Sequence, residues 1–401
     1  MKISKVPLSE IAPYIKRGIS PKYVEDDGVY ILNQKCIRNG RVSIEFAQFT
    51  NKNTRFSIEK ILQDGDILVN STGTGTLGRT APFFYNTGMV QAVVDTHITI
   101  VRPDESRINA LYLAYAIRLC ESEIINMAKG ATNQKELSAQ DLSQLSIIFR
   151  DRREQDRIAT ILSAYDNLIE NNRRRIQLLE ESARLLYQEW FIHLRFPGHE
   201  HVKVVDGVPE GWSSKIIDDV SEYINRGIAP KYDEEGEYVV INQKCIRNKI
   251  LTLELARRQS KEYKIEKSIQ LGDVLINSTG TGTLGRVAQV WNNLEKTTVD
   301  SHVTIVRPKI DIPYLWLGYT LMLLEKRLED MGEGATNQKE LNRARIREIE
   351  VKLPLQSIME EFHNFALSVA NQIQILIQQN NKLIQTRDIL LPRLMNGTIV
   401  V

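Results

Sequence analysis

The sequence predicts an α+β protein in which a globular domain followed by a long helix occurs twice. Three observations predict it: motifs recur along the whole chain, each copy has one long row of apolar residues at helical spacing, and short β-like runs bounded by Gly, Asn and Pro occupy the rest of each copy. We expect the globular domains in residues 1–150 and 196–350, and the long helices in residues 151–195 and 351–401.

The repeat copies a whole unit. Arg17 recurs as Arg226, a separation of 209 residues (226 − 17). The phrases NQKCIRN and NSTGTGTLGR, at residues 33–39 and 70–79 of the first copy, recur letter for letter, and GATNQKEL recurs at a separation of 204 residues (334 − 130). The separation falls in small steps from 209 to 204 residues, which indicates that the second copy has short deletions in its loops. The separation of 204 residues then holds through both long helices.

The long helices are predicted from apolar residues spaced by three and four, from Glu154 to Trp190 and again from Phe362 to Leu394. At 1.5 Å per residue the first would be roughly 55 Å long, too long to be hidden in one small domain, so it needs a partner helix. Each row contains one asparagine near its middle, and such a residue fixes the register of a helix pair. The alternative is that each amphipathic helix packs only on its own domain. The residues expected at the helix-pair interface are Ile158, Leu162, Ile169, Asn172, Ile176, Leu179, Phe362, Val369, Ile373, Leu376, Asn380 and Leu383.

Within the first globular copy the clearest β-like runs are residues 29–32, 66–69 and 97–101. Residues 111–127 have the apolar spacing of a helix. Ser138, with Asp141 three residues on, predicts the N-cap of a short helix that precedes a β-like run at 145–149, and Asn342 is the cap candidate of the second copy.

The composition is that of an ordinary globular protein with two or three domains: 401 residues, of which 42% are apolar and 25% charged. A net charge of +2 does not by itself indicate a nucleic-acid binder, so any DNA-binding cations must be clustered locally. Cys36, Cys120 and Cys245 are odd in number and lack CxxC spacing, which fits a reducing, cytoplasmic setting without thiolate metal sites. The longest apolar run, residues 312–324, is too short for a membrane span.

A glycine motif, Gly73-x-Gly75-x-x-Gly78, matches the dinucleotide-binding fingerprint, with Asp95 about twenty residues further on. A phosphate-binding turn must open a helix, whereas the residues after this motif include Pro82 and several aromatics. We therefore expect a glycine-rich turn between β-strands, and a nucleotide-binding enzyme is the alternative.

The histidines offer two further candidate sites. Asp95 and His97 alternate along an expected strand and so share one face, where they are expected to orient a loop rather than to catalyse. His193, His199 and His201 lie close together in the sequence, but no acidic or thiol ligand stands at the spacing of a tetrahedral zinc site. No metal site is predicted.

The candidate DNA-binding residues are the amide, cationic and hydroxyl side chains in the repeated loops. Asn and Gln pair bidentately with adenine, Arg and Lys with guanine, and the remaining donors suit phosphates. For Arg79 a phosphate contact or a structural ion pair is the expectation, and the alternative for every position is a simply solvated side chain. The candidates are Lys22, Tyr23, Asn33, Gln34, Lys35, Arg38, Arg79, Thr132, Asn133, Gln134 and Lys135, with Lys231, Tyr232, Asn242, Gln243, Lys244, Arg247, Arg286, Thr336, Asn337, Gln338 and Lys339 in the second copy.

The order of domain, long helix, domain, long helix resembles the specificity subunit of type I restriction-modification enzymes along essentially the whole chain. Similar phrases are GDIL at residues 65–68 before the glycine turn, EQ at 154–155 near the start of the first long helix, and VPEGW at 208–212 at the start of the second half. The family has a proline-rich entry to each long helix, which Pro354 keeps and residues 150–153 do not.

The resemblance implies a chain without an active site. Two target recognition domains would each read half of a split DNA sequence, and an antiparallel coiled coil of the two long helices would hold them apart and dock two adenine methyltransferase subunits. Translocase and nuclease subunits would complete the complex, and AdoMet, Mg and ATP would belong to those partners. A scaffold that joins helical partners without touching DNA is a further alternative.

An antiparallel helix pair would relate the two domains by a pseudo-two-fold axis, so matching loops would read inverted half-sites. The identity of NQKCIRN between the copies therefore predicts an interrupted, nearly palindromic target. The repeat also predicts that residues 1–195 alone dimerise through their helix.

Overall fold

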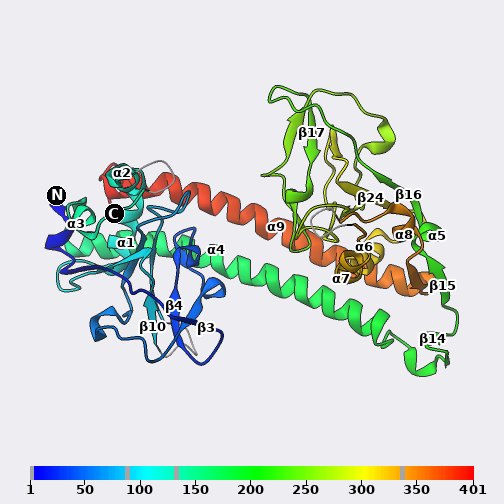
Figure 1. Ribbon diagram of the computed structural model, residues 1–401, viewed down its shortest axis with the longest axis horizontal. Coiled ribbons are helices and arrows are strands. Elements are labelled where there is room, and N and C mark those ends of the chain that lie inside the picture. The colour runs from blue at the N-terminus through cyan, green and yellow to red at the C-terminus, as the bar shows by residue number, and fades with distance from the viewer. Residues whose placement is uncertain (1–3, 86–90, 131–134, 335–338) are drawn as a thin grey trace. The chain divides into compact units, whose positions relative to one another are not determined.

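The computed structural model describes residues 4–85, 91–130, 135–334 and 339–401, and the chain divides into two compact units. Unit 1 comprises Met1–Asn172 and Gln378–Val401, and unit 2 comprises Arg173–Ile377. Both long helices, α4 (Arg152–Tyr187) and α9 (Gln356–Met395), therefore contribute one part to each unit (Figure 1).

The described residues of unit 1 form two four-stranded sheets. The first is antiparallel, in the order β2 (Tyr14–Arg17), β11 (Ile98–Arg102), β8 (Ile67–Asn70) and β9 (Thr80–Pro82). The second has the order β10 (Ala92–Val94), β4 (Val29–Leu32), β7 (Gln48–Thr50) and β3 (Tyr23–Val24), and its β10–β4 pair is parallel. Two short pairs join β1 (Ser4–Pro7) to β12 (Ser146–Phe149) and β5 (Ile37–Arg38) to β6 (Arg41–Val42). The shorter helices are α1 (Ala110–Leu119), α2 (Glu121–Met127) and α3 (Ala139–Ser143).

Unit 2 repeats this topology. Its antiparallel sheet has the order β16 (Ser221–Arg226), β24 (Val303–Pro308), β21 (Val274–Asn277) and β22 (Val287–Gln289). Its second sheet has the order β20 (Arg257–Gln259), β17 (Tyr238–Ile241) and β23 (Thr297–Val299), again with one parallel pair. The short pairs are β13 (Val204–Val205) with β14 (Val208–Pro209), β15 (Ser213–Ile216) with β25 (Glu350–Leu353), and β18 (Ile246–Arg247) with β19 (Ile250–Leu251). The shorter helices are α5 (Ile217–Val220), α6 (Tyr314–Leu323), α7 (Glu325–Asp330) and α8 (Arg343–Arg347).

A buried ion pair fixes the first sheet in each unit. Arg102 donates from Nε and Nη2 to the two carboxylate oxygens of Asp66, at 2.7 and 2.8 Å, and Arg307 holds Asp273 in the same bidentate way. Both aspartates are fully buried, so loss of either arginine would leave an uncompensated charge in the core.

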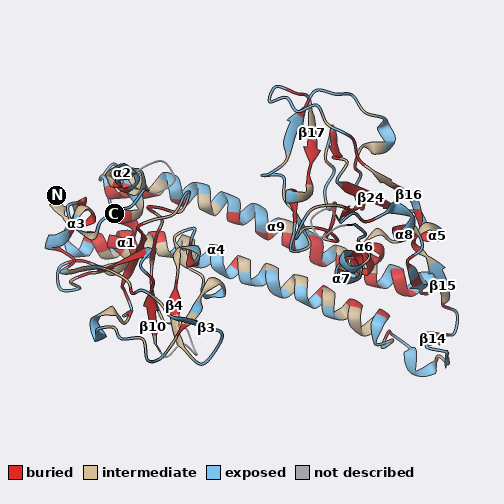
Figure 2. Cartoon of the chain, viewed as in Figure 1, coloured by how far each residue is buried: buried red, intermediate tan, exposed pale blue. Residues whose placement is uncertain are grey.

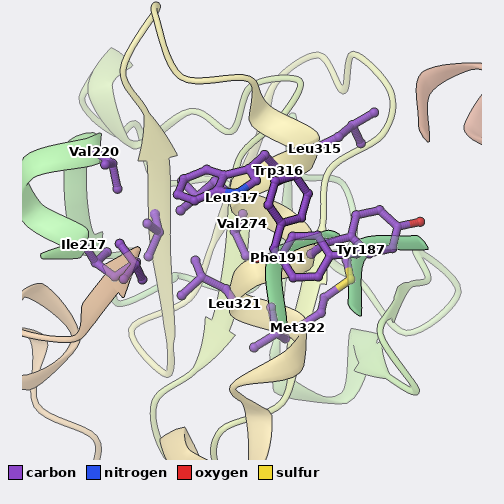
Figure 3. Close-up of a cluster of buried hydrophobic side chains, with 14 of the residues drawn as sticks. Tyr187, Phe191, Ile217, Val220, Val274, Leu315, Trp316, Leu317, Leu321 and Met322 are labelled. Carbon is purple, nitrogen blue, oxygen red and sulfur yellow. The ribbon is translucent and has the colours of Figure 1, made fainter. Parts of the chain in front are cut away.

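The long helices supply one wall of the core in each unit (Figure 2). In unit 1, Ile158 and Leu162 of α4 share a cluster with Leu391 and Leu394 of α9. In unit 2 the corresponding wall is aromatic: Tyr187, Phe191 and Phe362 pack with Trp316 of α6 and with other apolar residues, part of which Figure 3 shows. All twelve residues predicted at the helix pair are buried or half-buried.

The two helices run antiparallel where they pass through unit 1. Asp166 contacts Arg387 at 2.5 Å, and Asn172, six residues further along α4, bonds to Asn380, seven residues earlier on α9. Residue numbers thus rise along one helix as they fall along the other, which is the direction expected for the predicted coiled coil.

Most predicted elements coincide with observed ones within a residue or two, and both predicted caps are confirmed. Ser138 Oγ accepts a hydrogen bond from the backbone N–H of Asp141 at 2.9 Å, and Asn342 caps α8. The single helix predicted over residues 111–127 is wrong: it is interrupted at Cys120, where ψ is 12° and the backbone N–H bonds to the carbonyl of Ile117 in a tighter turn.

Candidate nucleic-acid interface

The repeated motifs meet at one end of the first sheet in unit 1. Arg17 ends β2, Asn70 ends β8 and Ile98 begins β11, and the strand register pairs Arg17 with Thr99 and Asn70 with Ile98. The phrase NSTGTGTLGR leaves this end at Asn70. The NQKCIRN loop, which follows β4 of the second sheet, is bonded to it through Asn70 and Gln34, and the end of the GATNQKEL phrase is bonded to it through Arg17 and Leu137. We call this end, with residues 17–23, 33–38, 70–79, 95–97 and 135–137, the loop surface of unit 1.

The glycine motif is a turn between two antiparallel strands, as predicted, because β8 precedes it and β9 follows it. Gly73, Gly75 and Gly78 all have positive φ, and a Cβ at Gly73 would lie 2.0 Å from Oε1 of Gln34. Asn70, fully buried, donates from Nδ2 to the backbone oxygens of Gln34 and Thr76 at 3.0 and 3.1 Å. The glycine turn and the NQKCIRN loop are therefore packed as one body.

Asp95 directly follows β10 and forms a β-bridge with Ile19, and His97 lies in the turn before β11, so the two residues do not alternate along one strand as predicted. The backbone N–H of His97 bonds to Oδ1 of Asp95 at 2.9 Å, the geometry by which an aspartate favours a turn. The predicted loop-orienting role is observed, since His97 Nδ1 lies 2.6 Å from Oγ1 of Thr72 in the glycine loop. Burial raises the pKa of the Asp95 carboxyl. Asp300 and His302 repeat this arrangement in unit 2.

The end of the GATNQKEL loop is fastened to β2. Arg17 donates from Nη2 to the backbone oxygen of Leu137 at 2.6 Å, and its Nη1 lies 2.5 Å from Glu136. Arg226 makes the same two contacts in unit 2 with Leu341 and Glu340. Lys135 and Lys339, next to these anchors, are exposed. The candidates Thr132, Asn133, Gln134, Thr336, Asn337 and Gln338 lie outside the described residues.

The candidates of the NQKCIRN loop divide into engaged and exposed side chains. Asn33 accepts from the backbone N–H of Lys35 at 2.9 Å and donates to the backbone oxygen of Phe46 at 2.8 Å, so its amide is used to shape the loop. Asn242 does the same in unit 2. Lys35 and Arg38 are exposed, and the Arg38 guanidinium lies over the Phe46 ring at 4.3 Å. Gln34 and Gln243 are half-buried, and Lys244 and Arg247 are exposed.

Lys22 and Tyr23 are exposed beside this loop, and so are Lys231 and Tyr232 in unit 2. Burial raises the pKa of the Tyr23 hydroxyl, and the Asp95 carboxylate raises it further. The two copies differ here. In unit 2 the Arg257 guanidinium lies over the Tyr232 ring at 3.6 Å, whereas the counterpart of Arg257 in unit 1 is Gln48, which has no charge.

Sequence reasoning missed Arg118, the one charged residue in the α1 sequence. It lines a cavity of about 390 Å³ together with Arg38, Arg79 and Glu121. Burial and then the charge of Arg387 lower the pKa of the Arg118 guanidinium, and its carboxylate contact, to Asp388, is 3.6 Å long. In unit 2 the counterpart of Arg118 is Met322, and the Arg286 guanidinium donates to the backbone oxygen of Gly282 at 2.7 Å.

The histidines of the linker make local contacts. His193 Nδ1 lies 2.9 Å from Glu189, and His199 Nδ1 lies 2.8 Å from the backbone oxygen of Phe196. In the described part of the chain no group of three His, Cys, Asp or Glu side chains is placed to hold a metal ion. No helix in the described ranges combines the length and apolar character needed to cross a membrane.

A surface of exposed lysine, arginine and tyrosine side chains, present once in each of two homologous units, is typical of a recognition protein. A family model described as "Type I restriction modification DNA specificity domain" matches the chain twice, at residues 2–181 and 209–389. The chain therefore belongs to the family of type I restriction-modification specificity subunits, which are non-catalytic.

Known relatives agree in length and layout. The type I restriction enzyme MjaIX specificity subunit of Methanocaldococcus jannaschii is 26% identical over 88% of this chain and 84% of its own length. The HindI specificity subunit of Haemophilus influenzae is 23% identical over 85% of this chain and 88% of its own length. The solved S subunit of a type I restriction-modification system from M. genitalium shares the fold, with a TM-score of 0.58 and 17% identity over 98% of this chain and 96% of that one.

Proposed function

We propose that this chain gives a type I restriction-modification complex its DNA sequence specificity by reading a bipartite target, one half-site with the loop surface of each unit. The observation that supports this most directly is the convergence of distant repeated motifs at one sheet end, where Lys35, Arg38 and Lys135 remain exposed. Exposed cations on a rigid platform suit both base edges in the major groove and phosphates.

The side chains have different proposed roles. Lys35 and Lys135, with their counterparts Lys244 and Lys339, are proposed to reach base edges, as are the amides of the GATNQKEL loops. Asn33 is proposed to act mainly through the shape of its loop, because both ends of its amide are already hydrogen-bonded. Lys22 and Tyr23 are proposed to contact the DNA backbone at the margin of the loop surface.

The Arg118 cavity is proposed to take a DNA phosphate. Three guanidinium groups, from Arg38, Arg79 and Arg118, line it with a single carboxylate, that of Glu121. Guanidinium groups bind phosphate oxygens with short, charge-assisted hydrogen bonds. Since Arg118 is replaced by Met322 in unit 2, the proposal gives unit 1 one more phosphate contact than unit 2.

The target is proposed to be interrupted and nearly palindromic, because the two units carry the same loop motifs. The antiparallel direction of the helices and the identity of NQKCIRN and GATNQKEL between copies support this. Mapping the methylated adenines in host DNA tests it. Half-sites of unrelated sequence would contradict it.

The partners follow from the same proposal. Two adenine methyltransferase subunits dock on the helix pair and the restriction subunits join them, in the cytoplasm, with AdoMet, Mg and ATP bound by those partners. The proposed parts of this chain are recognition domains at 1–150 and 196–350 and helices at 151–195 and 351–401.

One binding experiment separates this function from its alternatives. The complex with methyltransferase is titrated with target DNA at several salt concentrations, and tight, strongly salt-dependent, sequence-selective binding is expected. If the chain were a pure scaffold, the complex would bind DNA no more tightly than the methyltransferase alone does. A nucleotide-binding enzyme would instead show a thermal shift when the isolated chain is titrated with NAD or ATP.

A further inference from the structure

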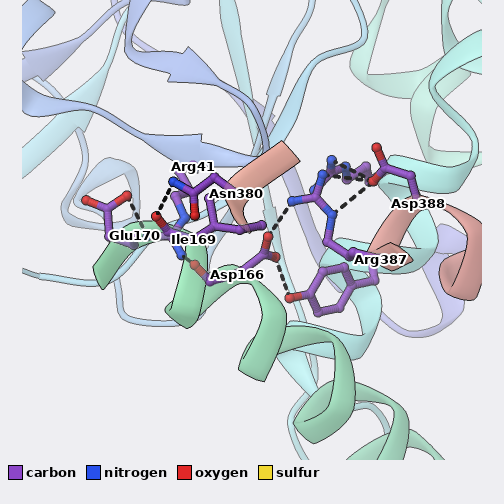
Figure 4. Close-up of polar contacts among 9 residues, drawn as sticks. Arg41, Asp166, Ile169, Glu170, Asn380, Arg387 and Asp388 are labelled. Atoms are coloured by element: carbon purple, nitrogen blue, oxygen red, sulfur yellow. Dashed lines mark hydrogen bonds and ion pairs between the residues drawn. The ribbon is translucent and has the colours of Figure 1, made fainter. Parts of the chain in front are cut away.

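A buried polar network joins α4 to α9 in unit 1 (Figure 4). Asp166 of α4 lies 2.5 Å from Nη1 of Arg387 on α9 and accepts a hydrogen bond from the hydroxyl of Tyr115 at 2.7 Å. The side chains of Asp166 and Arg387 are only 15% and 6% exposed. Arg41, from the β5–β6 hairpin, donates to the backbone oxygen of Asp166. The Asp166 carboxylate is thus compensated by a cation of the other helix, whereas Arg387 also contacts Asp388 of its own helix at 2.8 Å.

A second polar pair lies two turns away. Asn172 donates from Nδ2 to Oδ1 of Asn380 at 3.0 Å, and Asn380 donates in turn to the backbone oxygen of Ile169 at 3.3 Å. Both asparagines are 7% exposed. Each amide therefore depends on the other helix for its main hydrogen-bond partner.

These pairs are absent from the equivalent positions of unit 2. At the repeat separation of 204 residues, the counterparts of Asp166 and Arg387 are Ala370 and Ala183, and those of Asn172 and Asn380 are Leu376 and Ile176. All four counterparts are apolar and buried or half-buried. The two ends of the helix pair are thus alike in backbone and different in side-chain chemistry.

The difference determines which helices can pair. If two copies of this chain paired α4 with α4 in the same register, Asp166 would face Ala183 of the other copy, and Asn172 would face Ile176. If they paired α9 with α9, Arg387 would face Ala370 and Asn380 would face Leu376. A buried charge or amide without a partner is strongly unfavourable.

We propose that the Asp166–Arg387 and Asn172–Asn380 pairs make α4 select α9, and reject a second α4, as its partner. A partner for the first part of α4 must bring a cation to the position of Arg387 and an amide to that of Asn380. This proposal differs from the prediction made from the repeat alone, that residues 1–195 dimerise, because that prediction considered the apolar rows and not the buried polar residues.

The test replaces each of the four residues by its repeat counterpart in the full chain: Asp166→Ala, Arg387→Ala, Asn172→Leu and Asn380→Ile. Tagged and untagged full chains are unfolded, mixed and refolded together, and mixed dimers are counted by native mass spectrometry. We expect the wild type to remain monomeric, and the quadruple variant to form at least about ten times more mixed dimer. Two chains could also exchange helices, so that α4 of one chain packs on α9 of the other. Such a dimer has the same α4–α9 interface as the monomer, so it does not explain a difference in dimer yield between the wild type and the variant.

The matched control is the charge reversal Asp166→Arg with Arg387→Asp, which keeps an ion pair between the helices but still leaves unpaired charges in an α4–α4 pair. The charge-reversed variant should therefore stay monomeric, like the wild type. If the quadruple variant does not refold, the pair Asn172→Leu with Asn380→Ile gives the same comparison with a smaller expected increase. Equal dimer yields for the wild type and the refolded variant would overturn the proposal.

Discussion

Asn70 donates a hydrogen bond from Nδ2 to the backbone oxygen of Gln34 at 3.0 Å, and Asn277 makes the same bond to Gln243 in unit 2. This bond connects two loops that are 36 residues apart in the chain. It makes the glycine turn and the NQKCIRN loop one surface, so readout residues on either loop depend on it.

Asn70→Ala should therefore disturb recognition without removing any exposed side chain. The carbonyls of Gln34 and Thr76 would lose their buried donor, at a cost of about 1–3 kcal/mol in the free energy of unfolding. Urea unfolding measures the loss, and methylation of targets altered in one half-site measures the readout. We expect relaxed selectivity in one half-site only, and Asn277→Ala should relax the other.

Lys35→Ala and Asn33→Ala should separate base contact from loop shape. Lys35 is exposed, so its removal should leave stability unchanged and cost about 1–3 kcal/mol of base discrimination in one half-site. Asn33 caps the turn that carries Lys35, so its removal should also lower stability, by about 0.5–2 kcal/mol. Lys244→Ala is the matched control for the other half-site. Unchanged selectivity in Lys35→Ala would make that lysine a solvated side chain.

Arg118→Met should remove one phosphate contact. It places in unit 1 the residue that unit 2 has at position 322, and Asp388 keeps its 2.8 Å contact with Arg387, so the fold should tolerate it. We expect weaker binding to all sequences and a fall of about 1 in the slope of log K against log salt. Glu121→Gln, in the same cavity, is the control and should not lower the slope. A slope equal to that of the wild type would exclude Arg118 from the DNA contact.

The repeat explains why so much of the fold could be predicted. Each copy supplies a second example of the same element, so loop glycines, caps such as Ser138 and the two long apolar rows stand out from accidental patterns. The turn of Asp95 and the break at Cys120 could not be predicted in this way. Each depends on hydrogen bonds of the local backbone, which have no clear sequence motif, and the second copy has the same feature and so offers no contrast.

Side-chain partners were harder to predict than elements. The sequence places Asn172 and Asn380 in the apolar rows, yet they are not repeat counterparts, and only the antiparallel register brings them together. Arg118 was missed because its helix is otherwise apolar, and its cavity is built from β5, the glycine turn and α2 as well. The engagement of Asn33 depends on Phe46, which no motif connects to it.

His363 should make the stability of the protein depend on pH. It lies on α9, half-buried, with its ring against Tyr314 of α6 at 4.7 Å, and its Nδ1 is buried without a hydrogen-bond partner. Burial lowers the pKa of this imidazole, and the charge of Glu360 opposes that shift only in part. The unfolded chain therefore binds a proton at a higher pH than the folded chain does.

The sign of the effect follows from this difference in proton binding. Between the lowered pKa of folded His363 and its ordinary value near 6.5, the unfolded state binds more protons, so the free energy of unfolding rises with pH and falls on acidification. Denaturant midpoints measured from pH 7.5 to 5 should fall less in His363→Gln than in the wild type. His201→Gln, which changes an exposed histidine, is the control and should follow the wild-type curve. Parallel curves for His363→Gln and the wild type would show that the imidazole is protonated without cost in the folded state, and the acid sensitivity would then have to come from other groups.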